Sequence, residues 1–335
     1  MHDQPLKVLV SVSTAQNIGA SITAQAAPLK VQLLTPENAR PGDAVDIAFV
    51  SRDVTGLSTK HQTLPDTQHF YNLMTQAPKL HWLHVHSAGA DRQIYLDLQA
   101  HGVQVTTSAG NNAEVVAQTA VAGLLAIGRR FPELWRAQQQ RMWSPLIRRA
   151  LPPDLHGQTV TIVGWGGIGK SIARILQAIG LQIQVVRSSS TPTEEGFPCC
   201  AYEDIDTVLA NTQWLVLACP LTPRTRYLIH GERMALLPAG AGIVNVARGD
   251  VLDEAALIAL LQSEHLGGAY LDVFAHEPLS ENSLLWSLPN VIATPHSAGF
   301  SAGNAQRVTQ MFLDNLHAFA HEKPLRNIVT SHVQK

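Results

Sequence analysis

The chain has 335 residues, of which 45% are hydrophobic and 15% are charged, and its net charge at pH 7 is −2. This length predicts about two domains, and a nearly neutral chain offers no basic surface for nucleic acid or an anionic membrane. The cysteines include an adjacent pair, Cys199 and Cys200, which suits neither a disulfide framework nor a metal site. No apolar run is long enough to span a membrane or to act as a signal sequence. We therefore expect a cytoplasmic protein that binds no metal.

Residues 1–110 alternate short apolar runs with polar or helix-patterned segments, which is typical of a parallel α/β layer. The runs predict strands at Lys7–Val12, Val31–Leu34, Ile47–Val50, Leu80–Val85 and Val103–Thr106. A helix-patterned segment, Ala113–Arg130, follows and is predicted to lead into a second unit.

The same alternation returns after residue 158 and predicts a second doubly wound sheet. Its predicted strands are Val160–Val163, Leu181–Val186, Trp214–Ala218, Gly242–Asn245, Gly268–Leu271 and Val291–Thr294. A last amphipathic helix, about Ala302–Ala320, begins after that sheet is complete, so we expect it to return to the first domain. The predicted domains are therefore 1–111 with 299–335, and 112–298.

The most informative motif is Thr161–Lys170, TIVGWGGIGK, which reads as a buried strand, a glycine turn and the start of a helix. Gly164 permits the tight turn, Gly166 lets backbone amides approach a pyrophosphate, and Gly169 lets the helix pack closely on the strand. The cofactor-binding residues predicted here are Gly164, Trp165, Gly166, Gly167, Ile168 and Gly169. The predicted fold class is α/β with two doubly wound parallel-sheet domains, a Rossmann dinucleotide-binding domain and a discontinuous flavodoxin-like substrate domain.

The end of the second strand of this motif bears on the choice of cofactor. Sites for NAD usually place a carboxylate there to bind the ribose 2′-hydroxyl, but the sequence continues Arg187-Ser188-Ser189-Ser190. Arg187 can pair with a 2′-phosphate, and the hydroxyls of Ser188 and Ser189 can donate to it. The alternative is a solvated arginine in a polar loop. We expect NADP(H) to be preferred, with NAD(H) possible.

Three polar residues follow three late strands: Arg248, Glu277 and His296. An arginine can hold an α-keto acid by its carboxylate and polarise the adjacent carbonyl. A histidine can deliver the proton that a reduced carbonyl oxygen requires, and a nearby glutamate would stabilise the imidazolium. Each residue has a structural alternative, namely a capping arginine, a surface Glu-Pro turn and a hydrogen-bonded histidine. Spacing alone does not decide between these interpretations.

Several long motifs, in order, resemble the D-isomer-specific 2-hydroxyacid dehydrogenase family. They are GWGGIG, LACPLTPRTRYLI from Leu217, GIVNVARGDVLDEAAL from Gly242, GGAYLDVFAHEPL from Gly267 and ATPHSAG from Ala293. The resemblance implies that Arg248, Glu277 and His296 are the catalytic residues. It also implies that Asp272 lies near the nicotinamide carboxamide. Further cofactor contacts are expected from Cys219, Pro220, Thr225, Ala247, Arg248, His296 and Ala298.

For the substrate, the resemblance implies that Ser87–Asp91 is a loop whose amides at Ala88 and Gly89 receive the carboxylate, beside Arg248 and His296. Arg52, just after the Ile47–Val50 run, is a candidate for binding a second anionic group, although a lone arginine is more often a surface residue. The implied activity is NAD(P)H-dependent reduction of a small 2-keto acid, of the glyoxylate or hydroxypyruvate type, to the D-2-hydroxy acid by a homodimer. The alternatives are an NAD-dependent dehydrogenase of another D-2-hydroxy acid and a non-catalytic protein that senses dinucleotides.

Overall fold

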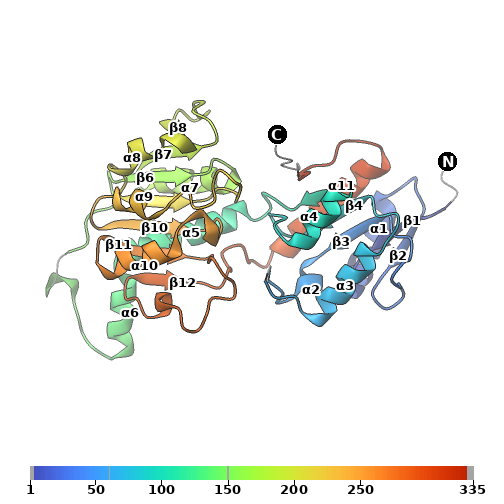
Figure 1. The fold of residues 1–335 in the computed structure, drawn as a ribbon, viewed down its shortest axis with the longest axis horizontal. Helices are drawn as coiled ribbons and strands as arrows, with labels where there is room; N and C mark the ends of the chain where they lie inside the picture. The colour runs from blue at the N-terminus through green and yellow to red at the C-terminus, as the bar shows by residue number, and fades with distance from the viewer. Residues whose placement is uncertain (1–3, 60, 149–150, 330–335) are drawn as a thin grey trace. The chain divides into compact units, whose positions relative to one another are not determined.

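A computed structural model describes residues 4–59, 61–148 and 151–329. The chain divides into two compact units, and Figure 1 shows that each contains both helices and strands. The smaller unit combines residues 1–112 with 301–335, and the larger unit is the continuous stretch 113–300. The last helix, α11 (Asn304–Ala320), therefore belongs to the smaller unit although it follows the larger one in the sequence.

The smaller unit is built on a parallel sheet with the strand order β2-β1-β3-β4-β5. This order is the flavodoxin-like form of a doubly wound sheet. Its strands are β1 (Leu6–Leu9), β2 (Val31–Leu34), β3 (Ile47–Val50), β4 (Trp82–Val85) and β5 (Gln104–Thr107). Its other helices are α1 (Val12–Gln25), α2 (Arg52–Thr55), α3 (Pro65–Thr75) and α4 (Gln93–Ala100).

Packing explains why α11 returns to the smaller unit. Phe312 of α11 is fully buried and stacks on Phe49 of β3, with ring centroids 4.3 Å apart. Trp82 of β4 also stacks on Phe312, with ring centroids 5.6 Å apart. Burying an aromatic side chain of this size stabilises a fold by about 1.5–3 kcal/mol. Helices α1 and α11 thus cover one face of the sheet, and α3 and α4 cover the other.

The larger unit has a parallel sheet with the strand order β12-β11-β10-β9-β6-β7-β8. Its strands are β6 (Thr159–Val163), β7 (Gln182–Arg187), β8 (Cys199–Ala201), β9 (Trp214–Leu217), β10 (Ala241–Asn245), β11 (Leu266–Leu271) and β12 (Val291–Ala293). Its helices are α5 (Ala113–Gly128), α6 (Phe131–Gln139), α7 (Gly167–Ala178), α8 (Asp206–Leu209), α9 (Gly231–Ala235) and α10 (Glu254–Gln262). The chain direction across the sheet reverses between β6 and β9, which defines a Rossmann-type switch point at the carboxyl ends of these two strands.

The predicted fold class is confirmed: both units are α/β with parallel, doubly wound sheets. Three local predictions were wrong. The first strand ends at Leu9 rather than Val12, because the Ser11 hydroxyl accepts a hydrogen bond from the Thr14 amide at 3.0 Å and caps α1. The first long helix ends at Gly128, two residues before Arg130, which has a positive φ of 57°. The short strand β8 was not among the predicted strands of the second sheet.

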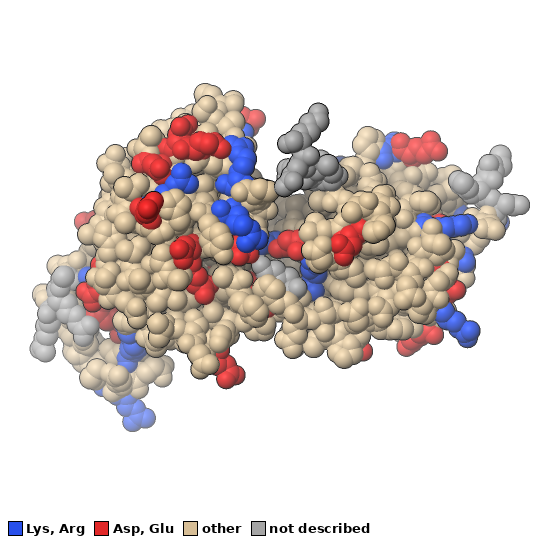
Figure 2. All heavy atoms as spheres, in the orientation of Figure 1, with Lys and Arg blue, Asp and Glu red and all other residues tan. Residues whose placement is uncertain are grey.

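Acidic and basic side chains both lie on the face shown in Figure 2, most of which is formed by other residues. Within the described residues, no helix combines the length and the apolar character needed to cross a membrane. The three cysteines are all free thiols.

Candidate active site

The glycine turn after β6 has the geometry of a pyrophosphate site. Gly164 has φ +106°, and a Cβ atom there would lie 2.6 Å from the backbone of Cys219 in the loop after β9. A Cβ atom on Gly169 would lie 2.1 Å from the carbonyl oxygen of Gly164. Gly166 caps α7 without a side-chain hydrogen bond, and nothing lies within 4 Å of where its Cβ would be. The space beside Gly166 at the start of α7 is therefore open, which fits a bound dinucleotide.

The other predicted residues of this turn lie around it. Trp165 and Ile168 are half-buried against the core beneath α7. The Thr225 hydroxyl is fully buried and donates to the Pro220 carbonyl at 2.6 Å, so it holds the loop after β9 in shape. The contacts that these residues were expected to make with a cofactor stay predictions.

Arg187 is the last residue of β7 and lies half-buried next to the switch point. Among the described residues its guanidinium has no hydrogen-bond or ion-pair partner, whereas Arg174, Arg224 and Arg233 of the same unit each contact a carboxylate. The hydroxyl of Ser189 donates to Thr191 at 3.2 Å. The end of β7 thus presents a cation and no acidic side chain, as the sequence predicted.

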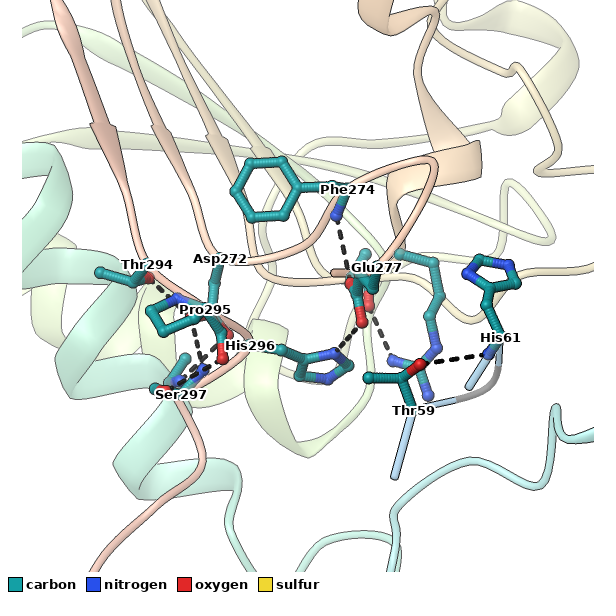
Figure 3. Close-up of polar contacts among 12 residues, drawn as sticks. Thr59, His61, Asp272, Phe274, Glu277, Thr294, Pro295, His296 and Ser297 are labelled. Carbon is teal, nitrogen blue, oxygen red and sulfur yellow. Dashed lines mark hydrogen bonds and ion pairs between the residues drawn. The ribbon is translucent and has the colours of Figure 1, made fainter. Parts of the chain in front are cut away.

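Asp272 joins two of the loops that follow the late strands (Figure 3). It follows β11, is 2% exposed, and accepts hydrogen bonds from the Ser297 amide at 2.7 Å and the Ala298 amide at 3.0 Å. The Thr294 hydroxyl donates to it at 2.7 Å. Burial raises the pKa of Asp272, while these hydrogen bonds and the nearby His296 oppose that rise. Both carboxylate oxygens therefore serve to fix the 294–298 loop.

His296 lies in that loop and contacts Glu277 directly (Figure 3). Its Nδ1 is 2.8 Å from Oε2 of Glu277, and the other carboxylate oxygen accepts from the Phe274 amide at 3.2 Å. The Glu277 side chain is 14% exposed and that of His296 is 49% exposed. His296 also has a positive φ of 52°, and its amide donates to the Asp272 carbonyl at 2.9 Å. The ring is thus anchored through Nδ1 and leaves Nε2 for another partner.

Arg248 follows β10 in a loop that packs against the Glu277 loop. A Cβ atom on Gly249 would lie 1.8 Å from the Phe274 carbonyl carbon, so only glycine allows this approach. The side chain of Asn245 accepts a hydrogen bond from the Ala247 amide at 3.0 Å and donates one to the Arg248 carbonyl at 3.1 Å. These two bonds fix the turn that follows β10. Nη1 of Arg248 donates to the Ala247 carbonyl at 2.7 Å.

Sequence reasoning missed several of these supporting residues. Asn245, Gly249 and Thr294 all lie in the quoted motifs, next to residues that were singled out. Their roles depend on which loops meet at the sheet edge. A buried asparagine at a strand end and a glycine after an arginine were the only local signals.

The remaining predicted residues lie in the smaller unit. Ala88 and Gly89 follow β4, and within the described residues their amides donate to no protein group. The Ser87 hydroxyl donates to the Gly89 carbonyl at 2.6 Å and shapes this loop. Arg52 begins α2; desolvation and the positive charge of Arg92 lower its pKa.

Comparison with known proteins places this arrangement in a family. Residues 121–298 match the D-isomer specific 2-hydroxyacid dehydrogenase, NAD binding domain. The chain is 33% identical over 256 residues to the glyoxylate/hydroxypyruvate reductase HPR3 of Arabidopsis thaliana, covering 76% of this chain and 77% of that protein. It is 31% identical over 292 residues to a glyoxylate reductase of Thermococcus kodakarensis, covering 85% of each.

A solved structure agrees with the sequence comparisons. The D-isomer specific 2-hydroxyacid dehydrogenase of Xanthobacter autotrophicus Py2, in complex with NADPH and MES, superposes with a TM-score of 0.73 at 29% identity, over 97% of this chain and 98% of that one. The fold and the glycine turn define a dinucleotide-dependent oxidoreductase. The chain belongs to the D-isomer-specific 2-hydroxyacid dehydrogenase family, and a nicotinamide dinucleotide is its cofactor.

Proposed function

We propose that this protein reduces a small 2-keto acid to the D-2-hydroxy acid with NAD(P)H, and that glyoxylate or hydroxypyruvate is the substrate. The observation that carries the proposal is the His296–Glu277 contact of 2.8 Å beside the Arg248 loop. The named relatives that reduce glyoxylate or hydroxypyruvate support the choice of substrate. We further propose that residues 1–111 with 299–335 bind the substrate, and that residues 112–298 bind the cofactor.

When bound, the reduced nicotinamide supplies a hydride to the carbonyl carbon. His296 then gives the proton from Nε2 to the carbonyl oxygen, so that an alcohol rather than an alkoxide leaves. Glu277 accepts a hydrogen bond from Nδ1, which selects the tautomer and stabilises the protonated ring. Arg248 binds the carboxylate of the keto acid and polarises its carbonyl. The amides of Ala88 and Gly89 bind the same carboxylate.

His296→Ala tests the proton donor. We expect kcat to fall by about 10²–10⁴, with the Kd for NADPH nearly unchanged. The matched control is His276→Ala, because His276 is an exposed histidine next to Glu277 in the same loop. Near-normal turnover by the His296 variant would remove this residue from the mechanism. Binding of dinucleotide by the wild type without turnover of any 2-keto acid would favour a sensing protein instead.

Arg248→Lys tests the carboxylate site. One ammonium cannot reproduce a planar grip on both the carboxylate and the carbonyl, so we expect KM to rise and kcat to fall together. Arg226→Lys is the control, since Arg226 is an exposed arginine that pairs with Asp250 at 3.5 Å. Wild-type kinetics in the Arg248 variant would mean that the arginine is structural.

We also propose that NADPH is preferred over NADH, because Arg187 has no protein partner in the described structure and no carboxylate follows β7. A charge-assisted hydrogen bond contributes about 1.5–3 kcal/mol, or about ten- to a hundredfold in affinity. The wild type should favour NADPH in kcat/KM by a factor in that range. Arg187→Ala should lose most of this preference and leave the NADH constants unchanged.

We propose a homodimer assembled through the segment from α6 onward. Large apolar side chains are exposed there, including Trp135 at 49%, Trp143 at 95% and Ile147 at 79%. Exposed apolar side chains of this size mark an interaction surface. Sedimentation should show a dimer, and Trp143→Glu should weaken it.

A further inference from the structure

A second arginine lies at the end of β7. Arg224 is in the loop after β9, on the other side of the glycine turn from Arg187. Its Nη2 donates to the carbonyl oxygen of Ser188 at 3.2 Å, so the side chain crosses from one loop to the next. Ser188 is therefore adjacent in sequence to one arginine and in contact with the other.

Tyr202 shows that the two guanidinium groups share one environment. It directly follows β8, whose Ala201 pairs with Arg187 of β7. The Arg224 guanidinium carbon lies 5.4 Å from the centre of the Tyr202 ring. Burial raises the pKa of Tyr202 to about 12, and the charges of Arg224 and Arg187 both oppose that rise. Both cations are thus close enough to act on the same phenol.

Glu203 fixes the orientation of Arg224. Its carboxylate accepts from Nε at 3.1 Å and from Nη2 at 2.7 Å, which is a two-pronged contact along one edge of the guanidinium. This contact lowers the pKa of Glu203. No hydrogen bond within the described residues uses Nη1 of Arg224. A rigidly held guanidinium with one uncommitted nitrogen is suited to bind an additional anion.

We propose that Arg224 binds the adenosine 2′-phosphate of NADP(H) together with Arg187, and that Glu203 is its positioning residue. The inference rests on the proposed preference for NADPH and adds a second loop to the specificity site. Arg187 reaches the phosphate from the end of β7, and Arg224 reaches it through Nη1 from the loop after β9. Two arginines and the single carboxylate of Glu203 together give this site a net positive charge. Lys and Arg side chains gather along one margin of the larger unit in Figure 2.

The test measures binding without turnover. The probes are 2′,5′-ADP and 5′-AMP, which differ only in the 2′-phosphate and lack the nicotinamide, titrated calorimetrically into the 335-residue protein. For Arg224→Gln we expect 2′,5′-ADP to bind about tenfold more weakly, with 5′-AMP changed by less than about twofold. The matched control is Arg226→Gln, which removes the same charge two residues away but pairs with Asp250 instead. It should leave the ratio of the two dissociation constants unchanged.

The outcomes separate this inference from the preference on which it rests. If the wild type does not discriminate between the two probes, the NADPH preference itself is wrong, and Arg224 has no phosphate to bind. If Arg187→Ala abolishes the discrimination between the two probes while Arg224→Gln keeps it, the preference for NADPH stands and Arg224 does not bind the 2′-phosphate. Equal weakening of both probes by Arg224→Gln would assign the arginine a structural role. Arg224→Lys keeps the positive charge but loses the planar set of guanidinium donors, so this variant should retain part of the discrimination between the probes.

Discussion

The first strand of each sheet leads through a turn into a helix, β1 into α1 and β6 into α7, but the two helix starts differ. In the smaller unit Ser11 caps α1, and its hydroxyl begins a chain of hydrogen bonds through Thr14 and Ser51 to Asp53. In the larger unit Gly166 caps α7 with no side chain, and the space above it is open. The start of α1 thus has a side-chain hydrogen-bond acceptor within the protein, whereas the start of α7 has none and can accept the anion that we propose.

The comparison offers a physical reason why we propose the dinucleotide site in the larger unit and not in the smaller one. The amides at the start of a helix need partners, and a serine supplies one permanently. Glycine supplies none, and it also removes the Cβ atom that would keep a phosphate away. The difference between the units is therefore a matter of a few residues at one turn.

The strongest way to break the comparison is Gly169→Ala. The new Cβ atom would lie 2.1 Å from the Gly164 carbonyl oxygen, and backbone cannot move aside cheaply. We expect a loss of about 3 kcal/mol in the free energy of unfolding, together with loss of dinucleotide binding. Gly166→Ala, in the same turn but facing open space, is the control and should remain near wild-type stability. Equal stability of the two variants in urea unfolding would contradict the packing argument.

Gly166→Asp would convert the open turn into a closed one. Gly166 has φ −92°, which any residue adopts, and an aspartate there can cap α7 favourably. Its carboxylate would occupy the pyrophosphate position and repel it, so we expect NADPH to bind at least about a hundredfold more weakly, with stability unchanged or increased. Gly166→Asn caps without a charge and separates blocking from repulsion. Retained NADPH affinity in the aspartate variant would place the pyrophosphate elsewhere.

The sequence was sufficient to predict this turn because all its determinants are local. The apolar run, the glycine spacing and the helix period lie within Thr161–Lys170. It was not sufficient for β8, because a strand of three residues is too short to show a periodic pattern. The same holds for the Arg224–Glu203 pair and for Gly249 against Phe274, because loops that meet at a sheet edge share no periodic signal.

The candidate site was predictable to a similar extent. The motifs predicted Glu277 and His296 as site residues, and the structure places Nδ1 of His296 2.8 Å from Oε2 of Glu277. The motifs also named Asp272, but as a residue beside the nicotinamide. Its hydrogen bonds to the 294–298 loop are a second task, and only the fold reveals it.

A buried histidine in the sheet of the smaller unit also predicts that the stability of the protein depends on pH. His84 of β4 is fully buried, and burial lowers its pKa from 6.5 to about 3. The unfolded chain takes up this proton below about pH 6.5 while the folded unit does not, so stability falls as the pH drops from there, by about 1.4 kcal/mol per unit. His84→Gln should make this dependence shallower in urea unfolding between about pH 7 and pH 5.5, and His86, whose pKa burial also lowers to about 3, should account for the slope that remains. The exposed His69→Gln is the control, and an equal slope in the His84 variant would contradict the assignment.

The smallest effect on stability is expected from Ser11→Ala, which removes the N-cap side chain of α1. The variant loses the hydroxyl that accepts the Thr14 amide at 3.0 Å, and such a cap contributes about 1 kcal/mol to stability. Removing it also leaves the Thr14 hydroxyl without its Ser11 donor, but keeps its own bond to Ser51 at 3.2 Å. Because α1 retains its side chains and has no glycine turn, the opened helix start should gain no affinity for NADPH or inorganic phosphate. Urea unfolding and calorimetric titration measure the two quantities separately. Gain of phosphate binding in this variant would show that the missing cap alone, without the glycines, is enough to make an anion site.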